Sequence, residues 1–499
     1  RPGYESLDLF GTDDGEISQV EVESRPQLRK AIGGVGFFCL AFGSMIGVGW
    51  ITALGGWVED AGPGGAMIAF AAGGLLMLLI GLCYAELTPM FPVTGGEVAY
   101  AYKAYGTDKA FLVGWFLTFG YLSVSAFEAV SVGIILAHLF PQLNVVPLYE
   151  IHGSTVYLPH LGLAFLFTAL ITWINYLGVR FAMRAQIFLT GMLIAGTLLF
   201  VTVGIIGGQT RNLNPLLVSP SLATNLEGIL SVFVMAPFWF VGFDTIAQAS
   251  EERIRGQRVQ LLGYYIILSI AGSVVFYILV MIAVGMASPW QTTVQQKLPT
   301  AAAFESVFES TAMVKLVLLT GVIGLLTSWN GFFIAGTRVL FALGRAKIID
   351  SRWGQVHHRY GTPSIAILAS GLITALAACL GKGALIAFVN VGSFCIAIAF
   401  LGVSLSLLRL RTTAPELSRP YRLPAAKVIA LSAMAGSVFI LTAMLVPWSP
   451  ASLSWPLEWI VLIAVTAGGI FVWIRGGETR RQISETERTR LVLEHHSED

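Results

Sequence analysis

The chain has 499 residues, of which 55% are hydrophobic and only 12% are charged, and its formal net charge is +1. Soluble domains carry about 25% charged residues, so this composition excludes an ordinary soluble protein, and the small net charge gives no support for nucleic acid binding. Apolar stretches of about 20 residues, each long enough to cross about 30 Å of hydrocarbon, recur along the chain and predict an all-α membrane protein. The four cysteines are scattered in apolar segments without metal-ligand spacing, so we interpret them as buried small hydrophobic residues.

Clusters of glycine, proline and charged residues separate the apolar stretches and predict twelve membrane-spanning helices. In chain order the predicted spans cover residues 33–57, 63–90, 111–140, 159–177, 182–208, 225–250, 261–287, 312–343, 363–381, 384–409, 426–446 and 456–475. Polar tails, residues 1–30 and 477–499, flank the spans. Between spans, residues 141–158 are predicted to form a loop and residues 297–311 a short amphipathic helix.

The distribution of lysine and arginine predicts how the spans are oriented. One set of loops carries seventeen of these residues, whereas the opposite set carries only four: Arg211, Lys297, Lys315 and Lys382. Because positive charges are retained in the cytoplasm, we expect both tails to be cytoplasmic. The sequence thus predicts a multi-pass protein of the plasma membrane.

Two of the predicted spans contain residues that interrupt a helix. The first span reads AFGSMIGVGW at residues 41–50, with Gly43, Gly47 and Gly49 close together. The sixth span carries Pro237 and Gly242 within an apolar run, and proline removes a backbone donor and clashes with the preceding turn. We expect the first and sixth helices to be broken at these points.

A broken helix inside a membrane exposes backbone N–H and C=O groups, which is tolerated only where they line a cavity. Free N–H groups at a helix N-terminus suit a carboxylate, and free carbonyl groups suit an ammonium group or a cation. Paired breaks therefore favour a binding site for a small zwitterion or amine. The alternative is that the glycines only permit close helix packing, as small residues do in membranes.

Six motifs in order resemble one transporter superfamily. They are GSMIGVGW (43–50), CYAELTPMFPVTGGEVAYAY (83–102), INYLGVRFAMRAQ (174–186), FWFVGFDTIAQASEE (238–252), GTRVLFALGRAKIID (336–350) and RLRTTAPELSRPYRLP (409–424). With these motifs the sequence resembles the amino acid–polyamine–organocation (APC) superfamily. The resemblance implies a LeuT-type fold in which residues 31–210 and 211–409 form inverted repeats of five spans each. Residues 410–476 would then add two C-terminal helices, and the protein would perform secondary transport by alternating access.

The resemblance also implies roles for residues at the two breaks. The backbone of Gly47, Val48 and Gly49 would bind the carboxylate of the substrate. Carbonyl groups near Phe238 and Val241 would bind its amine, and Phe238 matches an aromatic gate. Trp50 and Trp239 are bulkier than the family pattern, which indicates a small pocket unless either side chain packs outward.

Two acidic residues lie within the apolar spans. Glu128 is near the centre of the third span, where a carboxylate costs at least about 2.5 kcal/mol. It is predicted either to bind a cationic group or coupling proton, or to have a structural role through hydrogen bonds with Ser123, Ser125 or Ser131. Asp244 follows Gly242 and is predicted either to act at a gate in the substrate site or to cap the second half of the sixth helix.

The ion that would drive transport is left open between sodium and a proton. In some proton-coupled or uniport members of the superfamily, the ammonium group of a lysine in the fifth span lies where others bind sodium. The fifth span of this chain has no lysine. The resemblance places a possible sodium site at five oxygen ligands, the carbonyls of Gly43, Ile46 and Gly324 and the hydroxyls of Thr327 and Ser328. Oxygen ligands without a carboxylate suit a monovalent ion, although such hydroxyls often bond their own helix instead.

Other functions are less well supported by the sequence. A membrane enzyme would need a catalytic motif, and the chain has no GxSxG elbow, P-loop or cluster of metal ligands. A channel would need rings of ligands, against which the paired breaks argue. Exchange of amino acids or amines without ion coupling is the main alternative to ion-coupled uptake, and no cofactor besides the ion is expected.

Overall fold

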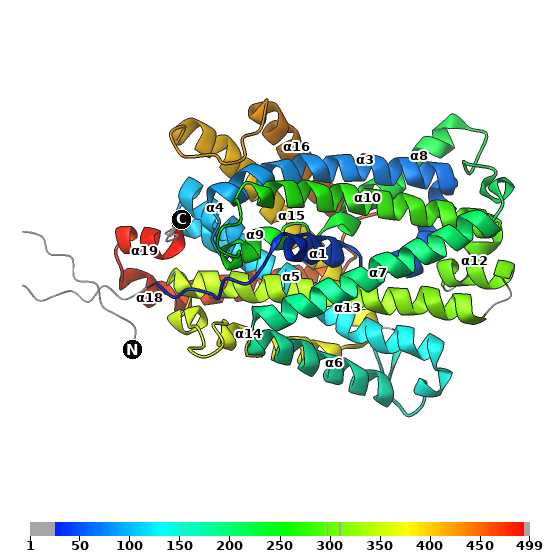
Figure 1. Cartoon of the computed structure of the whole chain (residues 1–499), viewed down its shortest axis with the longest axis horizontal. Helices are drawn as coiled ribbons and strands as arrows, with labels where there is room; N and C mark the ends of the chain where they lie inside the picture. The colour runs from blue at the N-terminus through cyan, green and yellow to red at the C-terminus, as the bar shows by residue number, and fades with distance from the viewer. Residues whose placement is uncertain (1–24, 152, 297, 309–310, 494–499) are drawn as a thin grey trace, which may run out of the picture.

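The computed structural model describes residues 25–493 except 152, 297, 309 and 310, and nearly all of its regular structure is helical. The α-helices are α1 Gly34–Met45, α2 Gly49–Thr52, α3 Leu54–Met90, α4 Gly96–Tyr105, α5 Thr107–Leu139, α6 Leu158–Leu177, α7 Val179–Gly207, α8 Leu222–Met235, α9 Thr245–Ala249, α10 Leu261–Ala287, α11 Trp290–Thr293, α12 Pro299–Phe308, α13 Thr311–Arg345, α14 Ser364–Ala378, α15 Gly381–Thr413, α16 Ala426–Leu445, α17 Leu457–Arg475, α18 Gly477–Arg481 and α19 Glu485–Leu493. Short 3-10 helices are η1 Pro141–Leu143, η2 Thr210–Leu213, η3 Ala236–Phe240, η4 Ser250–Glu252 and η5 Ser351–Gly354, and the strands are β1 Pro147–Ile151 and β2 Ser154–Tyr157. The long helices run side by side along the longest axis of the molecule (Figure 1).

Eleven helical segments of the described chain are long and apolar enough to cross a membrane, which confirms a helical membrane protein. The segment at the predicted ninth span, α14, is apolar but has only 15 residues. The count of twelve spans and the inverted repeat therefore stay predictions.

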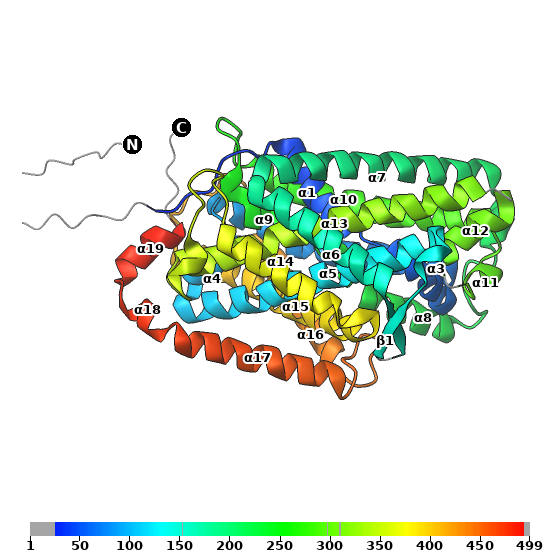
Figure 2. The ribbon, with the colours of Figure 1, turned by 90° about the horizontal axis from the view of Figure 1, so that it is seen from below.

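Both ends of the described chain lie at the same end of the molecule, which we call the terminal end. The Arg25 Nε–H donates a hydrogen bond to the Leu491 carbonyl at 3.0 Å. Figures 1 and 2 show the first described residues beside α19, away from β1 and α12 at the opposite, far end. The outermost parts of the two predicted tails, residues 1–24 and 494–499, lie outside the described residues.

The segment predicted as a loop at residues 141–158 is in part a β-hairpin, so that prediction was wrong. Strands β1 and β2 pair antiparallel, with Tyr149 opposite Val156. Thr155, Val156 and Tyr157 favour extended backbone, and Gly153 adopts the positive φ of +70° that the connecting turn needs. The helix predicted within residues 297–311 is present as α12.

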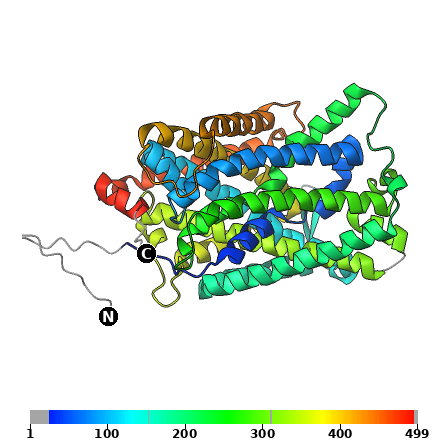
Figure 3. The ribbon, with the colours of Figure 1, turned by 45° about the horizontal axis from the view of Figure 1, so that its top comes forward.

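The first helix packs against three long helices. Helix α1 contacts α7, α10 and α13, and Figure 3 shows it between α7 and α10. Around it, α5 packs against α13 and α15, and α10 packs against α3. Residues at the C-terminal end of α1 and in the middle of the sixth segment are buried, among them Ile46 and Phe240, so a gap in either helix at these points faces protein or a cavity rather than lipid.

Candidate functional site

The two predicted helix breaks are present. Helix α1 ends at Met45, residues 46–48 are not helical, and α2 begins at Gly49. In the sixth segment α8 ends at Met235, η3 follows, and the chain is extended at Val241 before α9 begins. Gly242 has a φ of +130°, a conformation that side chains other than glycine rarely adopt.

The two breaks lie against each other. A Cβ atom at Gly242 would lie 2.9 Å from the backbone nitrogen of Met45, so only glycine permits this approach. The Tyr277 hydroxyl on α10 lies 3.2 Å from both the Met45 and the Trp239 carbonyl oxygens. Tyr277 thus supplies a donor to carbonyl groups at both breaks. This role could not be predicted from the sequence, because a tyrosine in an apolar span gives no local sign of its partners.

A cavity of about 370 Å³ lies at the breaks. Seven of the eight predicted substrate residues line it: Gly47, Val48, Gly49, Glu128, Phe238, Trp239 and Val241. The cavity continues to the segment that joins α16 to α17 on the side opposite the terminal end, where it is lined by Pro450, Ala451, Ser452 and Ser454. Its volume lies in the usual range for small-molecule sites.

The tryptophans differ in their placement. Trp239 lines the cavity and packs against the first break, because a Cβ atom at Gly49 would overlap its ring. Trp50 is fully buried and stacks on Phe200, with ring centroids 5.1 Å apart, and it is not among the lining residues. Trp239 therefore narrows the cavity, whereas Trp50 packs away from the cavity against Phe200.

Glu128 faces the first break from α5. Its side chain is buried, and a Cβ atom at Gly47 would lie 2.8 Å from Glu128 Oε1. Glu128 Oε2 has no hydrogen-bond partner among the described residues. The hydroxyls of Ser123 and Ser125 donate to backbone carbonyls of their own helix, at 2.8 and 3.0 Å, rather than to Glu128.

Glu128 is also the one ionisable side chain among the described residues that line the cavity. No lysine or arginine of the lining balances its charge. A buried carboxylate without a cation is unfavourable unless it is protonated or a ligand supplies the positive charge. This geometry gives a ligand with an ammonium group a direct electrostatic partner.

Asp244, the eighth predicted residue, does not line the cavity. It is fully buried on the terminal side of the second break, where it accepts hydrogen bonds from the Gly242 N–H at 3.1 Å and the Tyr121 hydroxyl at 2.6 Å. It occupies the N-cap position of α9, but the structure gives no side-chain capping hydrogen bond to that helix. Asp244 therefore fixes the second break rather than touching the cavity.

The two segments that carry the five predicted sodium ligands pack closely against each other. A Cβ atom at Gly324 would lie 3.0 Å from the Ile46 carbonyl oxygen, and one at Gly43 would lie 3.1 Å from Thr327 Cβ. Thr327 Oγ1 donates to the Gly324 carbonyl at 2.7 Å, which is the bond within its own helix that the sequence offers as the alternative to a sodium site. Neutral oxygens of this kind fit a monovalent cation.

The uncharged side chain of Gln186 lies beside the predicted sodium ligands and donates hydrogen bonds there. The Gln186 side-chain amide on α7 donates to the carbonyls of Cys39 and Thr327, both at 3.1 Å, and it accepts from Asn330 at 2.8 Å. The amide joins the first and eighth spans without an ion. Sequence reasoning missed Gln186 because the search of the fifth span was limited to lysine.

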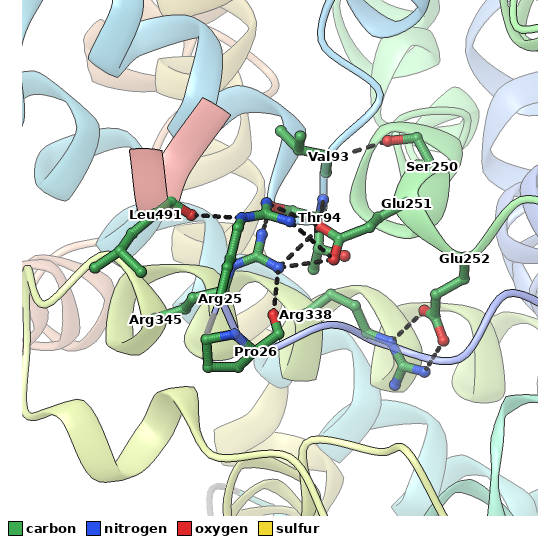
Figure 4. A network of polar contacts seen from close by, with 10 residues as sticks. All are labelled: Arg25, Pro26, Val93, Thr94, Ser250, Glu251, Glu252, Arg338, Arg345 and Leu491. Atoms are coloured by element: carbon green, nitrogen blue, oxygen red, sulfur yellow. Dashed lines mark hydrogen bonds and ion pairs between the residues drawn. The ribbon is translucent and has the colours of Figure 1, made fainter. Parts of the chain in front are cut away.

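Ion pairs close the terminal end (Figure 4). Glu251 accepts from Arg345 at 2.8 Å, from Arg25 at 3.3 Å and from the Thr94 N–H at 3.0 Å. Beside it, Glu252 and Arg338 form a two-point pair at 2.8 and 3.0 Å. All of these charged side chains are buried, so the terminal side of the breaks is sealed while the far side holds the cavity.

The comparisons with known proteins agree with this architecture. A family model described as amino acid permease matches residues 32–469. The chain belongs to the amino acid permease family. This amino acid permease is therefore an APC superfamily member and a transporter of amino acids or related organic molecules, not an enzyme.

Its relatives cover most of the chain. The branched-chain amino acid permease BcaP of Bacillus subtilis (strain 168) is 27% identical over 85% of this chain and 88% of its own length. The methylthioribose transporter of the same organism is 28% identical over 94% of this chain and 98% of its own length. The cationic amino acid transporter 4, vacuolar, of Arabidopsis thaliana is 28% identical over 78% of this chain and 64% of its own length.

Proposed function

We propose that this permease carries a small amino acid or organic amine by alternating access and binds it between the two helix breaks. The observation that carries the proposal is Glu128, a buried carboxylate without a cation that faces Gly47 in the cavity shared by both breaks. The backbone N–H groups of residues 47–49 would hold the substrate carboxylate. Glu128 and the carbonyls near Phe238 and Val241 would hold the ammonium group.

The names of the relatives support the substrate class. They include a branched-chain amino acid permease, cationic amino acid transporters and a methylthioribose transporter. Two of these three kinds of substrate share an α-amino carboxylate. Because that group is common to both, the proposal places it at the backbone of the breaks and assigns the side chain of the substrate to the wider part of the cavity.

We assign the terminal end to the cytoplasm of a plasma membrane, on the basis of the lysine and arginine distribution. With this orientation the structure has its cavity toward the outside and its ion pairs closing the cytoplasmic side. It then corresponds to the outward-facing state of an alternating-access cycle. The inward-facing state requires the Glu251 and Glu252 pairs to separate.

Sodium is one candidate for the driving ion. Gly43, Ile46, Gly324, Thr327 and Ser328 would hold it, and the ion would add a positive charge next to the first break that favours the substrate carboxylate. The Gln186 amide, which already joins the same helices, counts against sodium. Exchange without an ion is the other candidate, and proton coupling is argued in the next subsection.

Counterflow in proteoliposomes tests the proposed function. Vesicles loaded with unlabelled leucine, arginine or putrescine receive the same compound in labelled form at a low concentration. A carrier concentrates the label transiently and saturates, whereas a channel does neither. Saturable counterflow of at least one compound is expected, and its absence for all three would refute the proposed substrate class.

A further inference from the structure

A second pair of carboxyl groups lies between the cavity and the terminal end. Glu97, on α4, and Asp244, before α9, are 1% and 0% exposed. Among the described residues, neither forms an ion pair with lysine, arginine or histidine. This separates the pair from the neighbouring acids Glu251 and Glu252, each of which is held by arginine.

A chain of polar groups connects the two carboxyls. Tyr121, on α5, donates to Asp244 Oδ2 at 2.6 Å. Gln248, one turn after Asp244, donates through Nε2 to Glu97 Oε2 and to the Tyr121 hydroxyl, the latter at 3.4 Å. The Glu97 Oε1 atom and the Tyr84 hydroxyl are buried and have no hydrogen-bond partner of good geometry among the described residues. The Tyr84 hydroxyl nevertheless faces the Glu97 carboxyl as a weak donor.

The elements packed around the pair bring no compensating charge. Helices α3, α4 and α5 contribute tyrosines, α9 contributes a glutamine, and α15 places Phe400 against the Tyr84 ring. The arginines of α13, which also contacts α4 and α9, are engaged by other acids. Helix α19 reaches α4 through Glu485, which contacts Tyr102. The titratable groups that face the pair are Tyr84, Tyr100 and Tyr121.

Two ionised carboxyls in such a place would be strongly unfavourable. Burial penalises each charge, and the charges repel each other, so one carboxyl of a close pair keeps a proton. Burial, and after it the Asp244 carboxyl, raise the pKa of Glu97, which lies on α4 outside the long apolar spans. A proton on Glu97 would also give its unpartnered oxygen a role as a donor.

The pair is connected to the second break. Asp244 holds the Gly242 N–H, and Val241, one residue earlier, lines the cavity. On its other side α9 packs directly on α4, because a Cβ atom at Gly96 would lie 2.7 Å from the Ala247 side chain. Opening of the terminal side would separate α9 from α4 and admit water to both carboxyls. Water lowers the cost of ionisation and so favours release of a proton to that side.

We propose that Glu97 and Asp244 together bind one proton while the terminal side is closed and release it there when α9 separates from α4. The proton would enter past the second break from the cavity, and each transported substrate would be accompanied by one proton. This proposal rests on the transport function proposed above. It adds Glu97, which the substrate site does not use, as the residue that makes transport depend on a pH gradient.

The test uses the full chain in proteoliposomes with a pH-sensitive dye in the lumen. Labelled leucine and arginine serve as probes, and counterflow is measured on the same preparation. The wild type should acidify the lumen when a probe enters and should accumulate the probe when the outside is acidic. Glu97→Gln keeps the shape of a protonated carboxyl, so it should retain counterflow but lose acidification and accumulation, to the level of vesicles without protein.

The controls separate the proposal from a structural role and from the proposed function. Glu416→Gln removes an exposed carboxyl near the terminal end and should behave like the wild type. If Glu97→Gln does not fold, the same measurements on Asp244→Asn, together with proton movement in the wild type, decide whether the pair binds the coupling proton. Undiminished acidification in a folded Glu97→Gln variant would overturn the proposal, even with a lowered thermal stability. Strong counterflow by the wild type without any proton movement would also overturn the proton proposal. The absence of any counterflow would overturn the proposed function, and the proton proposal would fall with it.

Discussion

Replacement of Glu128 by glutamine tests the substrate site most directly. Glutamine has nearly the same shape and can still accept a hydrogen bond, so the change removes mainly the negative charge. In the structure this charge is 4% exposed and has no balancing cation in the cavity lining. Its interaction with an ammonium group should therefore be screened little by water.

The size of the effect follows from the difference between two kinds of hydrogen bond. Two unit charges 4 Å apart gain about 4 kcal/mol at an effective dielectric constant of about 20, and desolvation of both groups offsets part of that gain. Hydrogen bonds to charged groups contribute about 1.5–3 kcal/mol, and neutral ones about 1 kcal/mol. We expect Glu128→Gln to weaken binding of a compound with an amine by about 0.5–2 kcal/mol, which is about 2- to 30-fold in Kd.

The assay is a titration of thermal stability with leucine, arginine and putrescine, because a ligand that binds the folded state raises the unfolding midpoint. Putrescine, which has no carboxylate to hold, should lose the most. Glu86→Gln is the control, since Glu86 is also a buried carboxylate but is held by Arg411 and Arg419, and none of these three residues lines the cavity. It should lower stability without changing relative affinities. Normal affinity and normal pH-driven accumulation in Glu128→Gln would refute the role of Glu128. If the variant keeps exchange but loses accumulation, the coupling proton would be assigned to Glu128 instead of Glu97.

Further predictions concern the breaks, the sodium ligands and the closed terminal end. Gly49→Leu should abolish uptake in a folded protein, because its side chain must push the Trp239 ring into the cavity; wild-type uptake by this variant would argue against the site. Thr327→Val combined with Ser328→Ala should abolish any stimulation of uptake by sodium, and wild-type uptake that ignores sodium and follows a pH gradient would refute the sodium site. Glu251→Gln leaves two buried guanidinium groups poorly compensated, so it should destabilise the closed state by about 3–5 kcal/mol. A thermal unfolding midpoint equal to that of the wild type would contradict this last expectation.

The sequence predicts the helix breaks because their cause is local. Gly47, Pro237 and Gly242 act on the backbone where they stand, so the breaks can be located without knowing what surrounds them, although Gly43 remains within α1. The long apolar helices are predicted for the same reason. The hairpin at β1 and β2 was missed because a short strand pair between spans has little hydrophobic periodicity to reveal it.

Pairings between distant segments are a different matter. The acidic residues Glu251 and Glu252 and the arginines Arg338 and Arg345 all lie in motifs that the sequence brings to attention, but nothing local says which acid meets which arginine. Glu86 illustrates the same limit, since it is held by arginines of the last recognised motif, Arg411 and Arg419. Charged residues that recur in separate motifs signal that such pairs exist, and the fold decides the partners.

The polar groups that shape the site carry even less signal. Tyr277 and Gln186 are ordinary members of apolar spans, and their function depends on carbonyl groups presented by other helices. Asp244 shows the reverse case, because its position after Gly242 suggested a place in the substrate site. The structure instead turns its side chain toward Tyr121, on the terminal side of the break.

The hydrogen bond between Arg25 and the Leu491 carbonyl joins residues 466 positions apart in the chain. Ribosomes add about 5–20 residues per second, so about 20–90 s pass between synthesis of the two partners. The Glu251 and Glu252 ion pairs need only the chain as far as Arg345, whereas the contact with the Leu491 carbonyl also needs α19. The terminal end is therefore completed in two steps during biosynthesis, first by the ion pairs and then by the docking of α19 against Arg25.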